Sequence, residues 1–441
     1  MNFIPISEQE RDKMLKVIGK GIQELFSAIP EDLQLKTPLN LPSPLSELEV
    51  KREVQKLEKN NRELIHFAGG GIYDHYIPSV LKHITGRPEF YTAYTPYQPE
   101  VSQGTLQAMF EYQSMISDLT GMEVANASIY DGATALSEAV CMAIAVKKRK
   151  KVVLSEGINP HYLRVIKTYL RGSYPIEMIP LKGGFSEIDT KKIDKETACV
   201  VIQHPNYLGN LEEVSSFVEK AKSVGALSIL SFDPISLAIL KTPGEFDVDI
   251  ATAEGQSLGI PMSLGGAHLG IFTTKRKFIR KMPGRLAGQT VDNEGRVGYV
   301  MVLQTREQHI RRERATSNIC TNQQLCALSA ALYLSVMGCE GLKEVANQTT
   351  QKAHYLAKQL KNANFKLPYN KNNKRFFREF VVRIPYGAKR AIDSGLKKRY
   401  LSGIDLGKFK KEWENNLLIS VTEKRTKAEI DNLVEILSKA G

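Results

Sequence analysis

Between Val124 and Thr273, short runs of β-branched and aliphatic residues alternate with helical stretches, and this alternation constrains the fold more than any other feature. The runs are KVVLS, ACVVIQ, ALSILSF and HLGIFT, and each borders a polar loop. Strands that are buried on both faces of a sheet give such continuous apolar runs. The pattern predicts an α/β fold with a large, mostly parallel sheet covered by helices, and a ligand crevice at the carboxyl ends of the strands.

The first 65 residues predict a helical arm. Ser7 and Glu10 make a capping box for a helix whose apolar residues keep helical spacing as far as Ile29. A second, charged helix is expected from Ser46 to about Asn60. Both helices are amphipathic.

The rest of the chain predicts two domains. Residues 66–325 hold the alternating pattern and form the large α/β domain. Residues 326–441 form a small C-terminal α+β domain, which contains the predicted strand REFVVRI and a closing helix from Lys427 to Lys439.

Composition narrows the class of protein. With 441 residues, 42% hydrophobic and 24% charged, the chain is long enough and apolar enough to fold. Its five cysteines show no CxxC pair and its eight histidines no HxxxH, so we expect neither a disulfide framework nor a metal. The start lacks the apolar core of a signal peptide and no run of ~18 apolar residues occurs, so we expect a cytoplasmic protein with no membrane contact.

The formal net charge of +12 raises the question of nucleic-acid binding. Basic runs occur at 147–151, 275–281 and 311–314, but no zinc-finger or RNP-type motif accompanies them. Basic runs are commonly solvated faces or partner interfaces. We therefore expect no nucleic-acid partner, and an acidic protein or an anionic substrate fits the charge equally well.

Two segments of the large domain carry candidate binding residues. Asp131 precedes a helix whose first turn holds Gly132, Ala133 and Thr134, and such a helix start can hold a phosphate, although ordinary helix caps look the same. Asp233 ends the run ALSILSF. A buried carboxylate there can hold a protonated ring nitrogen, and the alternative is a turn-forming Asp-Pro.

Loops supply further candidates. FYTAYTPYQPEVSQG concentrates tyrosines among prolines, which suits a ligand or partner surface, or an aromatic cluster under a loop. FAGGGIYDHYIP places Gly69–Gly71 where a close backbone approach is expected. HIRRERATSNIC sets arginines beside Thr316–Asn318, which fits either anion binding or a solvated helix face followed by a capped helix start.

Taken together, these segments resemble the family of glycine dehydrogenase (decarboxylating) subunits, the glycine-cleavage P-proteins. FAGGGIYDHYIPSV through IYDGATALSEA is similar to its N-terminal half, and REQHIRRERATSNICTNQQL to a second hallmark. The resemblance covers essentially the whole chain. It implies a fold type I pyridoxal-phosphate-dependent transferase-like fold.

The resemblance also implies where the cofactor lies. The active half of the family carries its lysine in a motif of the form HKTF…PHGGGG, whereas this chain reads GQSLGIPMSLGG, and aligning Pro261 and Gly265–Gly266 puts Gln256 at the lysine position. Gln has no amine for a Schiff base. This departure matches subunit 1, the alpha subunit of the split form, with pyridoxal 5′-phosphate in a homologous lysine-bearing subunit 2.

The implied activity is the decarboxylation of glycine and transfer of the aminomethyl group to the lipoyl arm of H-protein, in an α2β2 complex whose isolated subunit 1 is inactive. The resemblance makes Tyr94, Thr95, Tyr97 and Glu100 candidates for entering the partner's pocket. It makes Asp131, Gly132, Ala133, Thr134 and Asp233 remnants of a degenerate site, and gives Arg314–Asn318 a place in either pocket or in a subunit contact.

Two alternatives stay open from the sequence. The chain could be an independent pyridoxal-phosphate enzyme that uses another lysine, such as Lys241 or Lys275, although their spacing argues against it. It could also be a non-catalytic scaffold or regulatory protein that kept the fold.

Overall fold

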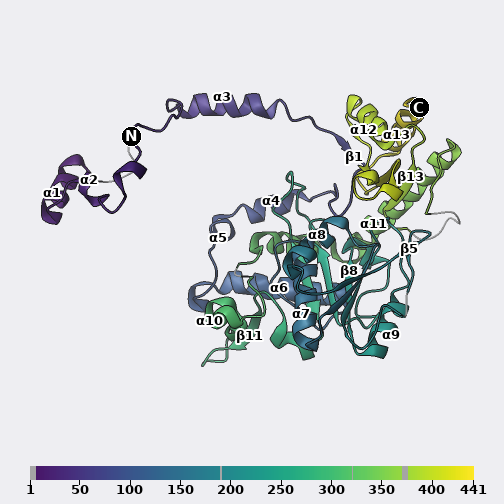
Figure 1. Ribbon diagram of the computed structural model, residues 1–441, viewed down its shortest axis with the longest axis horizontal. Coiled ribbons are helices and arrows are strands. Elements are labelled where there is room, and N and C mark those ends of the chain that lie inside the picture. The colour runs from purple at the N-terminus through teal and green to yellow at the C-terminus, as the bar shows by residue number, and fades with distance from the viewer. Residues whose placement is uncertain (1–5, 189–190, 320, 370–375) are drawn as a thin grey trace. The chain divides into compact units, whose positions relative to one another are not determined.

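The computed structural model describes residues 6–188, 191–319, 321–369 and 376–441. These residues fall into two compact units, Met1–Arg62 and Glu63–Gly441. Figure 1 shows the helices and strands of both.

The first unit is helical, with α1 (Glu8–Ile18), α2 (Ile22–Leu25) and α3 (Glu47–Glu58). The capping boxes of Ser7 and Ser46 confirm the two predicted helix starts. The prediction of one helix through to Ile29 was wrong, because Gly19 adopts a left-handed conformation (φ 72°) and ends α1. Within the described part of this unit, no residue is buried.

The second unit is built on a seven-stranded sheet. In order across the sheet, its strands are β2 (Val124–Ala125), β10 (Gly270–Thr274), β9 (Ile250–Glu254), β8 (Leu227–Phe232), β7 (Thr197–His204), β3 (Lys151–Ser155) and β4 (Ile176–Ile179). The run from β9 to β4 is parallel, and β10 is antiparallel to both of its neighbours. The predicted mostly parallel sheet is therefore confirmed.

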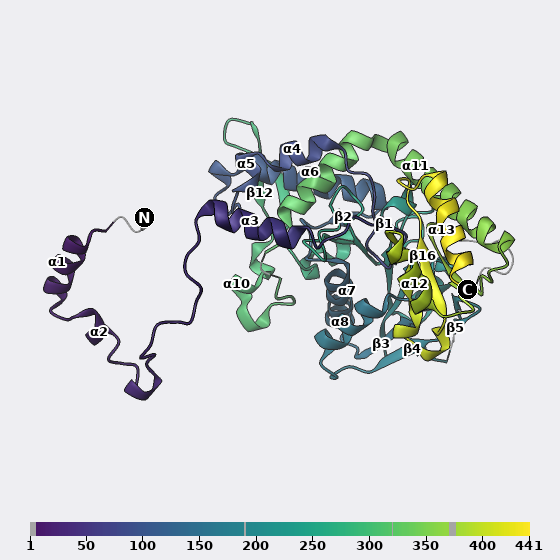
Figure 2. The same cartoon turned by 90° about the horizontal axis from the view of Figure 1, so that it is seen from above.

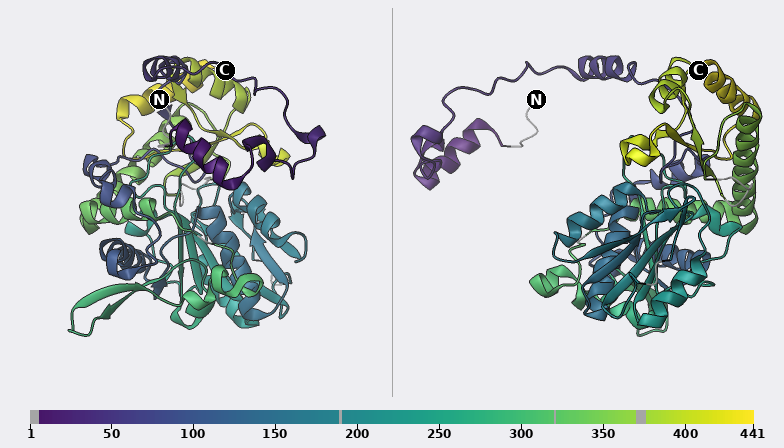
Figure 3. Two further views of the ribbon diagram at one scale, coloured as in Figure 1. Left: turned by 90° about the vertical axis from the view of Figure 1, so that its left-hand side faces the viewer. Right: turned by 45° about the vertical axis from the view of Figure 1, so that its right-hand side comes forward.

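Helices cover both faces of this sheet. Alternate residues of each strand point to opposite sides, so that Val153 and Ile202 pack on one side and Val152 and Val201 on the other. The first side is covered by α6 (Gln103–Thr120), α9 (Val214–Val224) and α11 (Gln324–Asn362). The second side is covered by α7 (Gly132–Lys147) and α8 (Pro160–Leu170), which run along the sheet in Figures 1 and 3.

A smaller sheet forms the C-terminal region. It has the order β13 (Glu379–Arg383), β16 (Asn416–Ser420) and β15 (Ile404–Asp405), and α12 (Ala388–Lys397) and α13 (Lys427–Lys439) pack with it. Figure 2 shows α13 beside β16. The strand predicted at REFVVRI and the closing helix are confirmed.

Helix α11 leads from the large sheet to the small one, with one non-helical residue, Gly338 (φ 59°). By length and apolar composition alone it could cross a membrane. Within the described residues it packs against α6, α13 and α4 (Ser79–Thr85).

The remaining strands are short and peripheral. They are β1 (Ile65–His66) with β14 (Tyr400–Leu401), β5 (Leu181–Lys182) with β6 (Phe185–Ser186), and the hairpin β11 (Ala287–Val291) and β12 (Val297–Met301). The remaining α-helices are α5 (Pro88–Tyr91) and α10 (Gln308–Arg311).

Candidate functional site

A small polar cavity lies at the carboxyl ends of β7, β8 and β9, where a parallel sheet predicts a ligand crevice. Its volume is about 40 Å³, which holds a few water molecules at most. Its lining residues are Gly71, Tyr73, Asn159, Tyr162, Gln203, Pro205, Gly209, Ser231, Phe232, Asp233, Pro234, Glu254, Arg378 and Glu379. None of these described lining residues is a lysine.

Asp233 stands at the end of β8 and its carboxylate is fully engaged. Oδ1 accepts hydrogen bonds from the backbone N–H groups of Ile235 (3.0 Å) and Ser236 (3.2 Å), which makes it the Asp-Pro turn residue of the alternative interpretation. Oδ2 accepts an ion-paired hydrogen bond from Nη2 of Arg378. The turn contacts match the Asp-Pro alternative, and the remaining carboxylate oxygen pairs with a side chain of the same protein where the other interpretation placed a ring nitrogen.

Arg378 directly precedes β13, so the region of the small sheet contributes a side chain to the lining of the cavity. Its side chain is 2% exposed. The guanidinium lies over the ring of Tyr73, 3.5 Å from the ring centroid, and Nη1 contacts Nε2 of His75. Nδ1 of His75 lies 2.6 Å from Oε2 of Glu423. A buried chain of charged and polar groups thus links Glu423 to Asp233 across the two sheets.

Glu379, next to Arg378, fixes the glycine segment. Its Oε1 accepts from the N–H of Gly70 (2.6 Å) and its Oε2 from the hydroxyl of Tyr73 (2.8 Å). A Cβ on Gly69 would lie 2.3 Å from Oε1 of Glu379, which confirms the close approach predicted for Gly69–Gly71. Burial raises the pKa of Glu379 to about 7, although the Gly70 N–H and the Arg378 guanidinium oppose this.

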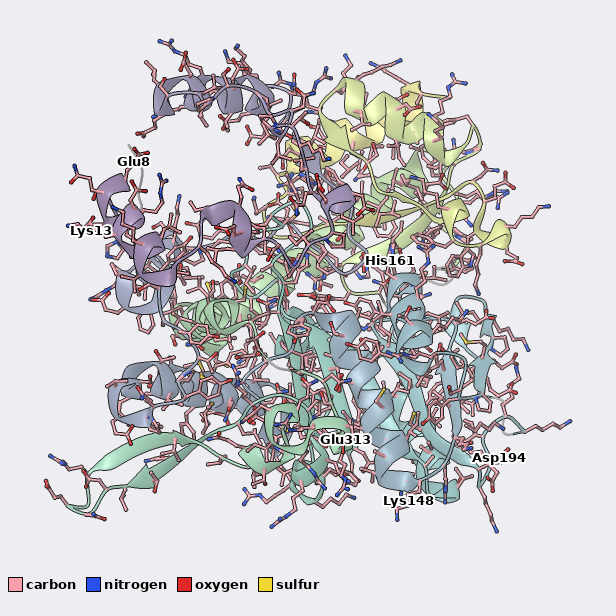
Figure 4. The ribbon with its side chains drawn as sticks, turned by 60° about the vertical axis from the view of Figure 1, so that its left-hand side comes forward. Glu8, Lys13, Lys148, His161, Asp194 and Glu313 are labelled. Atoms are coloured by element: carbon pink, nitrogen blue, oxygen red, sulfur yellow. The ribbon has the colours of Figure 1, made fainter. Side chains whose placement is uncertain are left out.

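The titration of Glu379 predicts a pH dependence of stability. Because the folded protein holds this proton up to about pH 7 and the unfolded chain releases it near the ordinary pKa of 4.5, the free energy of unfolding should fall as pH rises between these values. The contribution is at most about 1.4 kcal/mol per pH unit. In urea titrations at several pH values, Glu379→Gln should flatten this slope and Glu313→Gln, at an exposed side chain labelled in Figure 4, should leave it unchanged. An equal slope in wild type and Glu379→Gln would contradict the assignment.

Carboxyl groups already bind at the start of α7, for which the sequence left a phosphate cradle and an ordinary helix cap open. Asp131 caps α7 by accepting from the N–H of Thr134 (2.7 Å). Glu254, the last residue of β9, accepts from the N–H of Gly132 (2.9 Å) through Oε2 and from the N–H groups of Gln256 (2.9 Å) and Leu269 (3.1 Å) through Oε1. Burial raises the pKa of Glu254 to about 8. Two carboxyl groups therefore bind the N–H groups of Gly132 and Thr134 in the first turn of α7.

Gln256 follows Glu254 and is 2% exposed. Its Nε2 donates to the carbonyls of Ile260 (2.7 Å) and Tyr73 (3.1 Å), and its Oε1 accepts from the N–H of Tyr73 (2.9 Å). All three contacts are to the backbone. The amide thus ties the segment of Tyr73 to the loop after β9, outside the cavity lining.

The tyrosine loop lies apart from this cavity. Tyr94 is 81% exposed, Tyr97 is 47% exposed, Glu100 is exposed and Thr95 is half-buried. The buried Arg285, next to β11, supports the loop by donating to the Thr95 hydroxyl (3.4 Å) and the Tyr97 hydroxyl (3.2 Å). The guanidinium also lies 5.5 Å from the Tyr97 ring centroid. The tyrosine loop therefore exposes Tyr94, while Thr95 and Tyr97 are held by the buried guanidinium of Arg285.

The arginine segment 311–318 is largely exposed. Arg314 pairs only loosely with Glu313, at 3.7 Å, and both side chains are exposed. Ser317 caps the chain locally by accepting from the N–H of Ile319 at 3.1 Å. The Ser317 hydroxyl also hydrogen-bonds the buried carboxyl group of Glu138 on α7, whereas the Arg314 side chain is open to solvent.

Neither alternative lysine reaches the cavity. Thr274 pairs with Ile250, the first residue of β9, so Lys275 lies at the opposite, amino edge of the parallel strands. There its Nζ pairs with Asp247 (2.6 Å). Lys241 is exposed and lies over the ring of Phe246. Within the described residues, no group of three or more His, Cys, Asp or Glu side chains could hold a metal.

This α/β fold and the position of its cavity define a fold type I pyridoxal-phosphate-dependent class of protein. A NifS-like protein (TM-score 0.64, 12% identity, 85% of this chain and 98% of that one) and the alanine–glyoxylate aminotransferase of a Nostoc species (0.61, 16%, 93% and 98%) share the fold. A crystal structure of glycine decarboxylase (P-protein) of the glycine cleavage system in inhibitor-bound form matches with a TM-score of 0.93 and 41% identity over all of both chains.

The sequence comparisons give the family. The model of the glycine cleavage system P-protein matches residues 1–437, and the chain belongs to this family. It is 48% identical to the probable glycine dehydrogenase (decarboxylating) subunit 1 of Chloroherpeton thalassium over all of both chains, and 46% identical to that of Moorella thermoacetica over 98% of each. The resemblance found in the sequence, to subunit 1 of this family, is confirmed.

Pyridoxal phosphate is the cofactor of this fold class, and the residues of the cavity do not fit it. The cavity has a volume of about 40 Å³. Pockets that bind small molecules and cofactors have volumes of ~300 Å³ or more. The guanidinium of Arg378 already pairs with the Asp233 carboxylate, and the carboxyl group of Glu254 already accepts from the N–H of Gly132 at the start of α7. The side chain of Gln256 supplies no amine for a Schiff base.

Sequence reasoning missed Arg378, Glu379 and the role of Glu254. Arg378 and Glu379 are the first two residues of the predicted strand REFVVRI, and Glu254 precedes Gln256 by two residues. Two adjacent charged residues at the start of a buried strand were the available signal, since buried charges need partners. The sequence offered no means of pairing Arg378 with Asp233, 145 residues away.

Proposed function

We propose that this chain is the non-lysine-bearing subunit of glycine decarboxylase in the glycine cleavage system, and that a homologous lysine-bearing subunit holds pyridoxal 5′-phosphate. The observation that carries this proposal is Gln256, whose amide is fully engaged with backbone groups at the lysine position. The 48% identity to a relative named subunit 1 supports it.

In this proposal pyridoxal phosphate, held by the lysine of the partner subunit, would supply the electron sink for the decarboxylation of glycine. The lipoyl arm of H-protein takes the aminomethyl group. This chain contributes Tyr94, Thr95, Tyr97 and Glu100, which would enter the partner's pocket and help to orient glycine and exclude water there. Arg285 holds Thr95 and Tyr97 in place for this task.

We further propose that the complex is an α2β2 tetramer in the cytoplasm. We propose too that residues 66–325 and 326–441 are its large and small domains and residues 1–65 an arm. The exposed apolar side chains of α1 and α3, such as Val17 (89%) and Leu57 (67%), support a role for the arm in subunit contacts.

The proposal is tested by reconstitution. The full chain, expressed alone with pyridoxal phosphate and treated with borohydride, should carry no reduced adduct on any lysine and should not exchange the glycine carboxyl group with bicarbonate. Mixed with the lysine-bearing subunit and H-protein, it should co-purify with the former and restore exchange. A reduced adduct on Lys241 or Lys275 would instead establish an independent enzyme, and failure to pair with the other subunit would favour a scaffold.

Phe substitutions test the tyrosine loop. If Tyr94 and Tyr97 enter the partner's pocket, Tyr94→Phe/Tyr97→Phe should lower exchange by the reconstituted complex about a hundredfold or more, the range for one lost transition-state hydrogen-bond donor. The complex should stay assembled on gel filtration. Tyr169→Phe on α8, outside the tyrosine loop, is the matched control. Wild-type turnover of the double variant would remove both residues from the site.

A further inference from the structure

The cavity at the carboxyl edge of the sheet contains a cation and a carboxyl group in fixed positions. The cation is the guanidinium of Arg378 on Asp233, and the carboxyl group is that of Glu254 at the start of α7. Each arrives from a different element: Arg378 precedes β13 in the small sheet, and Glu254 ends β9 in the large one.

These two groups match the two polar ends of pyridoxal phosphate. A buried aspartate pairs with the protonated ring nitrogen of this cofactor, and a helix start binds its phosphate. Arg378 offers Asp233 a planar cation stacked on Tyr73, 3.5 Å from the ring centroid. Glu254 offers the N–H of Gly132 a carboxyl oxygen at 2.9 Å.

We propose that Arg378 and Glu254 are built-in replacements for the cofactor, and that they keep the site closed independently of the missing lysine. For the identity of the excluded cofactor this inference rests on the proposed function. The lysine position and the binding contacts have then been lost separately. Restoring a lysine is insufficient for cofactor binding, because both contact sites stay occupied.

The replacement also fixes the small sheet against the large one. Arg378 and Glu379 reach from β13 to Asp233 and Tyr73, and Gly209 of the large domain packs against the backbone of Glu379. Nearby, His161 at the start of α8 packs edge-to-face on Phe409 of the C-terminal region, with ring centroids 5.3 Å apart (Figure 4). Without Arg378 and without a bound cofactor, Asp233 would have no cation partner. The small sheet would then be held less firmly against the large one.

The test measures uptake of pyridoxal 5′-phosphate by the full chain alone, by equilibrium dialysis and by borohydride reduction with peptide mapping. Gln256→Lys should take up no more cofactor than the wild type. Gln256→Lys/Glu254→Ala/Arg378→Leu should bind at least about tenfold more tightly than Gln256→Lys and be reduced at the introduced lysine, where tenfold corresponds to about 1.4 kcal/mol. Gln256→Lys/Arg425→Leu, which removes a buried ion-paired arginine beside Asp74, should behave as Gln256→Lys.

Circular dichroism and melting establish which variants are folded. If the triple variant is unfolded, Gln256→Lys/Glu254→Ala decides, because it keeps the Arg378 ion pair and must still exceed Gln256→Lys in uptake. Full uptake by Gln256→Lys alone, or none by a folded variant with the contacts opened, would overturn the inference. Since neither glycine nor a partner subunit is present, these results are separate from success or failure of the proposed function.

Discussion

Replacing Gly209 with alanine should destabilise the protein by about 4 kcal/mol or more, an exceptional loss for one methyl group. Gly209 has φ 86°, and a Cβ on it would lie 1.9 Å from the carbonyl oxygen of Glu379 and 2.4 Å from its carbonyl carbon. Both contacts are with backbone, which cannot rotate away. The added methyl group must therefore push the loop that ends at Asn210 away from β13, and with it disturb Glu379 and the cavity.

Gly183→Ala is the matched control for backbone conformation. Gly183 has φ 61°, and among the described residues no heavy atom lies within 4 Å of its added Cβ. Its loss should be limited to the left-handed conformation itself, about 1–2 kcal/mol. Urea unfolding of both variants, followed by circular dichroism, gives the comparison. Equal losses of unfolding free energy in the two variants would contradict a steric clash between the added methyl group at position 209 and the backbone of Glu379.

The features that were predictable from the sequence are those that depend on local pattern. The apolar runs ending at Phe232 and Thr273 were predictable as strands because residues buried on both faces have no polar alternation. Ser7 and Ser46 marked helix starts because a capping box lies within four residues. Gly19 was the local signal that was passed over, since apolar spacing continues across it while the backbone turns.

The site depended on contacts between distant segments. Asp233 was identified because its place at a strand end is visible in the sequence. Its partner was not, because nothing local distinguishes Arg378 from the other basic residues of a chain with 60 lysines and arginines. The residues of α7 alone could not separate a phosphate cradle from an ordinary helix cap, because Glu254, which binds the N–H of Gly132, lies 122 residues further on.

Arg378→Met should destabilise the protein by about 3–5 kcal/mol. Arg378 is 2% exposed and pairs with Asp233, whose side chain is 11% exposed, so removing the guanidinium leaves a carboxylate in a site with little access to water. Methionine fills much of the vacated volume and keeps the contact with Tyr73 apolar, which limits the cavity term. The decrease in the free energy of unfolding then reflects mainly the unpaired carboxylate of Asp233. It should appear as a lower urea midpoint at which both sheets unfold together.

A double-mutant cycle separates charge from packing. Asp233→Asn removes the negative charge and keeps the turn bonds to Ile235 and Ser236, because the amide oxygen can accept them. In that background the guanidinium has lost its countercharge, so Arg378→Met should cost far less, with a coupling energy of roughly 2–3 kcal/mol. A coupling below about 0.5 kcal/mol would mean that Arg378 acts by filling space alone. Arg378 would then not replace the positive charge of a cofactor beside Asp233. A guanidinium that acts through its charge must stabilise the protein less once the aspartate is replaced by a neutral residue.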